Sequence, residues 1–399
     1  MGKNLTVLKN LHPEDILLLS CIRCFVDKNN LDLLRDFNLK EMDWGYVIRT
    51  SYWHGVLPLL CYTLQAACRE AIPGDIQIEL QDMLKKTALR NLAMASELLR
   101  LLDLFQAHGI RAIPFKGPLL ASSIYGNLSL RQFGDLDILV PREDASRAKD
   151  LLKAEGYQWL CERHKKHETA ITRSDSHYHL HNPDSRIKVE VHWRISQSIY
   201  LSKVDVDGLW KRAKLVAFCG RKVQSFSSED TLLVLCEHGA KHNWESLLWI
   251  CDVALLAKAN DLNWTLVIKQ AQEAGSQRTL LLGLLLANHF LGACLPVEIN
   301  EMIEADPELL GIAAEEMKGL FVKKDEEETS LASVWNGANQ MLLYLKATDQ
   351  LQHRMRCCLA LFFAPTLADI EIVSLPKCLF PLYYPVRPLR IVRTLFKQK

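Results

Sequence analysis

The residues best suited to chemistry are two aspartates that flank one leucine, Asp135 and Asp137, in the segment DLDILV. Alternation along a strand puts both aspartates on one face, with Leu136 and Ile138 on the other. Two carboxylates this close repel each other unless a cation lies between them. A hard divalent ion, Mg²⁺ or Mn²⁺, takes carboxylate oxygens and keeps positions open for phosphates. The pair therefore predicts a metal site that serves phosphate chemistry.

A third acid, Glu190, lies in a later segment whose polar and apolar residues alternate strictly. In residues 187–193, IKVEVHW, the alternation puts Glu190 and His192 on one face of a predicted strand. If that strand neighbours the aspartate strand, Glu190 points to the same side as Asp135 and Asp137. Three converging carboxylates hold two divalent ions, one activating an attacking oxygen and one on a triphosphate. The alternative is a solvated D-x-D turn and a surface glutamate.

The elements around these acids predict an α+β sheet domain over residues 106–225. A strand at 110–115 leads into the turn Lys116-Gly117, and the aspartate strand follows at 136–140 after a short helix. Further predicted elements are a helix at 142–155 and strands at 157–161, 177–181 and 187–193. Strand, helix, strand and helix followed by a run of strands is typical of an α+β domain.

Helical periodicity flanks this domain on both sides. We expect an N-terminal helical segment over residues 1–105, a helical domain over 226–364 and a C-terminal tail over 365–399. Leucines at three- and four-residue spacings within 76–107 predict one or two amphipathic helices. The tail is expected to be partly extended and ends in basic residues. Its simplest interpretation is a helix packed on the helical domain, and the alternative is peripheral contact with an anionic membrane surface or a partner.

Composition narrows the class of protein. The 399 residues carry 48 Lys and Arg against 47 Asp and Glu, a net charge of +1, which excludes a globally basic nucleic-acid coat and gives no strong nucleic-acid signal. Cys21 and Cys24 have no second pair to complete a zinc site. No segment approaches the ~18–20 apolar residues of a spanning helix, and no secretory signal is read at the N-terminus. We therefore expect a cytoplasmic protein with reduced thiols.

The order of these motifs resembles the DNA-polymerase-beta-type nucleotidyltransferase superfamily. Its layout is a strand ending in a glycine turn, a short helix, two spaced aspartates on a second strand and a third acid on a later strand. More closely, and nearly over its full length, the chain resembles the group of uncharacterised nucleotidyltransferase family proteins. The motifs that carry this resemblance are Lys116-Gly117, Tyr125-Gly126, Arg131, residues 135–140, Gly156-Tyr157 and residues 189–193, joined by residues 43–44, 54–58 and 238–252.

The resemblance implies a minimal nucleotidyltransferase mixed sheet between N-terminal helices and a C-terminal helical domain. It implies metal-dependent transfer of a nucleoside monophosphate from an NTP to an acceptor, with release of pyrophosphate. Asp135 and Asp137 would bind the Mg²⁺ or Mn²⁺ ions. Glu190 would complete the second metal site and help to deprotonate the acceptor. The expected partners are thus an NTP and an acceptor molecule. The sequence does not identify the acceptor or the base of the NTP.

The resemblance also implies nucleotide-binding residues. Lys116 and Gly117 would hold the triphosphate, and Arg131 and His192 would lie close to it. The wider superfamily has Gly-Ser at this turn, whereas here Pro118 follows the glycine and has no N–H to give to a phosphate. In this interpretation Lys116 replaces that donor with a positive charge, and Arg131 adds a bidentate contact. The alternative for Arg131 is a structural ion pair with one of the aspartates.

Histidines cluster in this sequence. His177, His179 and His181 alternate and therefore share one face of a predicted strand. Imidazoles two residues apart on a strand lie about 6–7 Å apart, so neighbours are not expected to share an ion easily. We interpret these histidines chiefly as polar residues of the sheet face or a pocket. A substrate contact and a zinc site are the alternatives.

A second group of polar residues follows the sheet domain. His238, His242, Glu245 and Asp252 fall on about one face of a helix, if that helix continues unbroken past Gly239. The resemblance places this segment beside the transferase site, where it would line the acceptor pocket. Two other functions are carried forward: a histidine-based metal hydrolase, and a catalytically weak nucleotide-binding or scaffold protein of a biosynthetic cluster.

Overall fold

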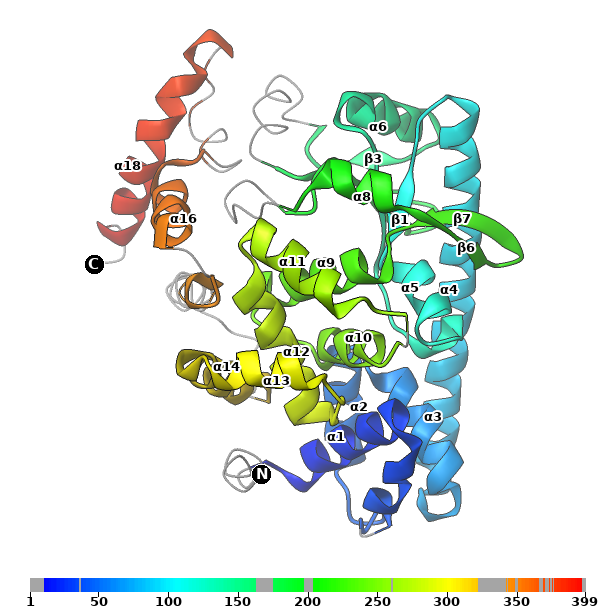
Figure 1. Ribbon diagram of the computed structural model, residues 1–399. Helices are drawn as coiled ribbons and strands as arrows, with labels where there is room; N and C mark the ends of the chain where they lie inside the picture. The colour runs from blue at the N-terminus through cyan, green and yellow to red at the C-terminus, as the bar shows by residue number, and fades with distance from the viewer. Residues whose placement is uncertain are drawn as a thin grey trace.

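The fold is built around a mixed sheet, which helices flank together with a smaller two-stranded sheet (Figure 1). The computed structural model describes residues 11–35, 37–162, 175–196, 204–259, 261–321, 342, 344–348, 351–365, 369, 373, 375 and 377–396. His164 and His167, which the sequence places in a charged loop, lie outside the described residues.

Within the described residues, the main sheet has five strands in the order β1-β2-β5-β4-β3. Its strands are β1 (Ile113–Phe115), β2 (Asp135–Leu139), β3 (Gln158–Trp159), β4 (His177–His181) and β5 (Lys188–His192). The central strands β2 and β5 are parallel, and every other neighbouring pair in this sheet is antiparallel. The mixed sheet of an α+β domain is therefore confirmed, and strands that are distant in sequence lie side by side at its centre.

One face of this sheet is apolar and forms the core of the domain. Alternation sends Leu136 and Ile138 of β2 and Val189 and Val191 of β5 to this face, and all four are fully buried. They pack in one cluster with α4 (Gly74–Ala107) and α6 (Ala145–Ala154). The leucine-rich stretch of the sequence is thus a single long helix, α4, which runs past both the sheet and the N-terminal helices (Figure 1). The opposite, polar face of the sheet carries Asp135, Asp137 and Glu190.

The helices on the N-terminal and C-terminal sides of the sheet share one hydrophobic core. The N-terminal group is α1 (Pro13–Val26), η2 (Lys28–Leu34), α2 (Trp44–Trp53), α3 (Leu57–Ala67) and η3 (Arg69–Ala71). The later group is α9 (Ser228–Lys241), α10 (Leu247–Ala257), α11 (Trp264–Ala274), α12 (Gln277–Leu291), α13 (Val297–Glu304) and α14 (Pro307–Leu320). Buried residues such as Leu18 of α1, Leu60 of α3 and Leu284 of α12 belong to the same cluster. Chain segments on either side of the sheet are therefore held together by burial of apolar surface.

Smaller elements close the edges of the sheet. A two-stranded sheet of β6 (Lys214–Phe218) and β7 (Arg221–Ser225) follows α8 (Val206–Arg212). Phe115 of β1, Leu139 of β2 and Phe226 pack in a small cluster with Leu209 of α8. This cluster covers the edge strand β1 just before the turn at Lys116. The cluster therefore holds β1 in place, and with it the turn at Lys116 that follows.

The C-terminal part contains α16 (Leu351–Phe363), η8 (Lys377–Leu382) and α18 (Tyr383–Phe396). The expectation of a partly extended tail is corrected over residues 377–396, which are helical, and α18 packs beside α16 (Figure 1). Asp369 is fully buried and forms ion pairs with Arg387 and Arg390 of α18. In the part of the chain that the structure describes, no helix has both the length and the apolar character needed to cross a bilayer.

Candidate active site

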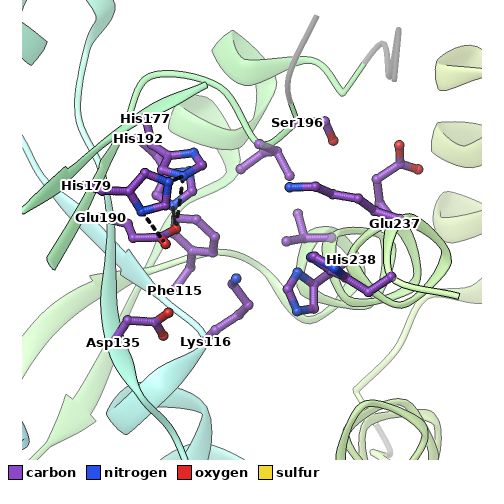
Figure 2. Close-up of a pocket in the computed structure, with 14 residues that line it drawn as sticks. Phe115, Lys116, Asp135, His177, His179, Glu190, His192, Ser196, Glu237 and His238 are labelled. Atoms are coloured by element: carbon purple, nitrogen blue, oxygen red, sulfur yellow. Dashed lines mark hydrogen bonds and ion pairs between the residues drawn. The ribbon is translucent and has the colours of Figure 1, made fainter. Parts of the chain in front are cut away.

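The predicted acids meet at the centre of the sheet. In the parallel register of β2 and β5, Asp137 pairs with Glu190 and Asp135 pairs with Lys188. Residues that pair directly in a parallel ladder point to the same face, so all three acids lie on the polar side. Asp135 and Glu190 line a cavity of about 300 Å³ (Figure 2). Asp137, between them in the register, is buried.

The turn between β1 and α5 (Gly117–Ser123) delivers Lys116 to these acids. Lys116 has φ 57° and ψ −150°, a region that side-chain-bearing residues rarely occupy, so the turn stores strain. Gly117 follows with φ 44°, and a Cβ there would meet the backbone oxygen of Asp135 at 3.3 Å. This close approach requires glycine. The strained turn places the Lys116 Nζ 3.1 Å from the Asp137 Oδ1.

The charges of this group shift one another. Burial alone would raise the pKa of Asp137, but Lys116 and His192 outweigh it and lower the pKa below its ordinary value. Burial first, and the Asp137 carboxylate second, raise the pKa of Asp135 to about 6. For Lys116, burial opposes the charge, yet the attraction of the three acids raises its pKa. Of the three predicted acids, Asp135 is thus the one whose charge is least compensated, since the pKa values of Asp137 and Glu190 are lowered.

His192 joins the two central strands of the site. Its Nε2 lies 3.0 Å from the Asp137 Oδ1 and 3.1 Å from the Glu190 Oε2. Burial opposes protonation of His192, but its hydrogen bonds to Asp137 and Glu190 raise its pKa. The ligand atoms of Asp137, Glu190 and His192 all lie within 4.8 Å of one another. Two carboxylates and an imidazole at these distances form a donor set that fits a divalent cation.

The neighbouring strand β4 adds two histidines to the same face. Its antiparallel register pairs His177 with His192 and His179 with Glu190. The expected separation of the imidazoles is wrong, because the His177 and His179 ring centroids lie 4.2 Å apart and their Nε2 atoms 2.7 Å apart. Both rings contact Glu190, with the His177 Nε2 at 3.4 Å and the His179 Nδ1 at 3.0 Å from its carboxylate oxygens. Sequence alternation indicated the shared face, and only the side-chain conformations reveal the shared partner.

Helix α9 forms the opposite wall of the cavity with Glu237 and His238 (Figure 2). Lys241 at its end and the C-cap residue His242 also line the cavity. The His238 ring packs against the His242 ring at 4.8 Å and against the Trp249 ring at 5.1 Å. Burial, followed by the charge of Lys116, lowers the pKa of both His238 and Lys241. The sheet wall of the cavity therefore combines carboxylates with histidines, and the helical wall combines one glutamate with histidines and a lysine.

The expectation of one polar helical face over this segment is wrong in its second half. Helix α9 passes Gly239 but ends at Lys241, and Asn243 and Trp244 then have φ 49° each. This turn separates Asp252 from His238 and places it on α10. Neither the turn nor its direction was indicated by the helical spacing.

Arg131 is likewise not among the residues that line this cavity. Its Nε and Nη2 donate to the two carboxylate oxygens of Asp252 at 2.8 and 2.7 Å, and both side chains are buried. The Tyr125 hydroxyl donates to the same carboxylate at 2.6 Å. Arg131 therefore joins the segment before β2 to α10, and the predicted phosphate contact is corrected to a structural ion pair. The expected alternative, a pair with Asp135 or Asp137, is also wrong.

A mixed sheet with paired aspartates, a later glutamate and a lysine-glycine turn defines a nucleotidyltransferase-type protein. Residues 40–292 match the model of the family described as uncharacterised nucleotidyltransferase, and the chain belongs to this family. Membership supports nucleotidyl transfer as the general activity.

A crystal structure of an antigenic nucleotidyltransferase-like protein from Paracoccidioides brasiliensis is similar over 52% of this chain and 94% of that chain, with 13% identity and a TM-score of 0.27. A search among curated proteins gave no match.

Proposed function

We propose that this protein transfers a nucleoside monophosphate from an NTP to an acceptor in a divalent-metal-dependent reaction. The observation that carries the proposal is the register that sets Asp137 opposite Glu190, with the Lys116 Nζ 3.1 Å from Asp137. In this reaction the acceptor atom bonds to the α-phosphorus. The bond from that phosphorus to its bridging oxygen breaks, and pyrophosphate leaves with the electron pair.

The sheet wall supplies the cation site of this proposal. Asp135, Asp137 and Glu190 would hold Mg²⁺ or Mn²⁺, since their carboxylates converge from neighbouring strands. A divalent cation bound there would neutralise phosphate charge and polarise the α-phosphate. His192 holds Asp137 and Glu190 in position by contacting both. That Glu190 also takes the acceptor's proton stays a prediction.

Two lysines support the proposal that the triphosphate binds between the sheet and helix α9. Lys116 on the turn and Lys241 on α9 line the same cavity from opposite sides. Both are largely withdrawn from bulk water, where an interaction with phosphate charge is stronger than at an exposed surface. Gly117, which allows close approach of the backbone, follows Lys116 at the start of α5. We assign Lys116, Gly117 and Lys241 to triphosphate binding.

A second cavity provides room for the other substrate. It has a volume of about 410 Å³ and shares Phe115 and Lys116 with the first cavity. Its walls combine apolar side chains with the hydroxyl groups of Ser225 and Thr231. An apolar pocket with a few polar groups suits a nucleobase or a small organic acceptor. Two cavities that meet at Lys116 are consistent with a two-substrate reaction.

The test is transfer of label from an α-phosphate-labelled NTP, together with pyrophosphate release, in Mg²⁺ or Mn²⁺. Asp137→Asn and Glu190→Gln should lower turnover by about 100-fold or more, because each would weaken binding of the cation that stabilises charge on the reacting phosphate. Asp144→Asn is the control, since Asp144 lies on η5 (Arg142–Asp144) and pairs with Arg147. Parent-level turnover in both site variants would refute the proposal. Metal-dependent NTP binding without turnover, across acceptor mixtures, would favour the nucleotide-binding or scaffold function instead.

A further inference from the structure

Glu190 faces two directions within the site. One side of its carboxylate meets His192 and the aspartate strand, as described above. The other side meets β4, whose register places His179 directly opposite Glu190 and His177 two pairs further along, opposite His192. Figure 2 shows His177 and His179 gathered over Glu190, on the far side from Asp135. The carboxylate is therefore shared between an oxygen-rich group and an imidazole-rich group.

The distances within the imidazole-rich group are those of a compact ligand set. The His179 Nδ1 lies 3.0 Å from the Glu190 Oε1, and the His177 Nε2 lies 3.4 Å from the Glu190 Oε2. Ligands about 2.1 Å from one ion lie about 3.0 Å apart at right angles and about 3.4 Å apart at the tetrahedral angle. One ligand atom each from His177, His179 and Glu190 can be chosen within 4.8 Å of the others. The three residues thus need only small side-chain adjustments to enclose an ion.

A second contact orients His177 for this purpose. Its Nδ1 lies 2.7 Å from the Ser176 Oγ, which is itself fully buried. Histidines that ligate metals usually use their second ring nitrogen in such a hydrogen bond, which fixes the ring and its tautomer. This bond leaves the Nε2 as the atom that points to Glu190. Ser176 therefore has the position of an outer-sphere partner.

The ligand types decide which ion fits. Mg²⁺ takes oxygen ligands and keeps its waters, whereas imidazole nitrogen favours divalent transition ions. Two imidazoles and one carboxylate form the set found where zinc keeps a coordination position open for water or substrate. His177, His179 and Glu190 all line the cavity, so an open position would face it.

We propose that His177, His179 and Glu190 form a second cation site that takes an imidazole-favouring divalent ion, with Zn²⁺ as the best match. The site is distinct in ligand chemistry from the Asp135 and Asp137 group and shares Glu190 with it. It rests on the proposed function only through that shared carboxylate. The transferase cavity would then hold one ion of oxygen-ligand type and one of nitrogen-ligand type.

The experiment titrates Zn²⁺ into metal-stripped full-length protein by calorimetry, with excess Mg²⁺ present to occupy oxygen sites. The parent should bind one Zn²⁺ with measurable heat. His177→Gln and His179→Gln should each weaken that binding by at least about 10-fold. His181→Gln is the matched control, because His181 lies on the same strand face but pairs with Lys188, and it should bind Zn²⁺ like the parent. Co²⁺ absorption in the visible range gives a second readout of the nitrogen ligands.

Two arms keep this inference separate from the proposed transfer reaction. Asp135→Asn should weaken binding of a Mg²⁺–NTP complex and leave the Zn²⁺ stoichiometry unchanged. Zn²⁺ binding that persists at parent strength in both histidine variants, or no Zn²⁺ binding by the parent in Mg²⁺, would overturn the inference without touching NTP transfer. Zn²⁺ binding that follows the histidines, in a protein without NTP turnover, would count against the transfer reaction alone. If buried His177 cannot be replaced without unfolding, His179, whose side chain is 42% exposed, carries the test.

Discussion

Asp137 and Glu190 lie opposite each other on parallel strands, and His192 Nε2 contacts both carboxylates at 3.0 and 3.1 Å. The two acids are 53 positions apart in a chain of 399 residues (190 − 137 = 53), so no local rule sets their separation. Their approach depends on β5 entering the sheet beside β2 instead of beside β3. The repulsion between the acids is then countered by Lys116, His192 and the other histidines of the site.

Two substitutions of Lys116 can separate the effect of backbone strain on stability from the effect of the lysine charge on ligand binding. Lys116→Ala keeps an unfavourable backbone conformation, whereas Lys116→Gly relieves it. We expect the glycine variant to be about 1–2 kcal/mol more stable than the alanine variant in urea unfolding. Both variants should lose affinity for a metal–NTP complex to the same extent, since both lack the Nζ. Equal stability of the two variants would show that the turn is unstrained.

The buried pair of Arg131 and Asp252 predicts a large effect on stability. Arg131→Met leaves the Asp252 carboxylate, which is fully buried, without its cation and should cost about 3–5 kcal/mol. The double variant with Asp252→Leu should recover much of that loss, because it removes the uncompensated charge as well. Denaturant unfolding measures both effects. In the folded double variant, metal–NTP affinity should stay near that of the parent. A loss of this affinity would indicate that Arg131 does contribute to nucleotide binding.

Glu316 on α14 predicts a pH-dependent contribution to stability. Burial first, and then the charges of Glu245 and Glu315, raise the pKa of Glu316 to about 8. Between the ordinary glutamate pKa and about 8, the folded state holds a proton that the unfolded state has released. The free energy of unfolding therefore falls as the pH rises through that window, by up to roughly 1.4 kcal/mol per pH unit.

The test of this contribution compares Glu316→Gln with the parent in thermal melts from pH 5 to pH 8.5. The variant should gain stability relative to the parent as the pH rises, because it has no carboxyl group to ionise. Glu301→Gln is the control, since Glu301 is exposed on α13 and is not one of the charges that shift Glu316. A difference between Glu316→Gln and the parent that does not change with pH would contradict the prediction.

The wall of the cavity formed by α9 depends on Trp244, which packs between two helices. A Cβ on Gly239 of α9 would overlap the Trp244 ring, and a Cβ on Gly283 of α12 would meet it at 2.7 Å. Gly239→Ala should therefore destabilise the protein by about 1–3 kcal/mol and displace His238 and Lys241. Gly311→Ala on α14 is the matched control, because nothing lies within 4 Å of its Cβ position, and it should be neutral or stabilising. Parent-like melting of Gly239→Ala would show that Trp244 can move aside.

The sequence by itself determined the local features of this protein. Strict alternation in residues 187–193 predicted a strand with Glu190 and His192 on one face, and the structure has β5 at Lys188–His192. The spacing of Asp135 and Asp137 in the same way predicted a shared face of β2. These predictions depend only on the period-two geometry of a strand, which neighbouring residues set among themselves. Leucine spacing likewise indicated α4, although not that it is a single helix.

Only the tertiary structure decided which of these faces meet. The order β1-β2-β5-β4-β3 puts Glu190 between Asp137 and His179, and the turn after α9 sends Asp252 to Arg131, 121 residues away. Strand order and ion-pair choice follow from how the buried faces of the sheet and helices pack together, which is a property of the whole chain. Side-chain spacing along one strand therefore predicted correctly that the acids share a face of the sheet. It predicted the separation of the His177 and His179 rings wrongly.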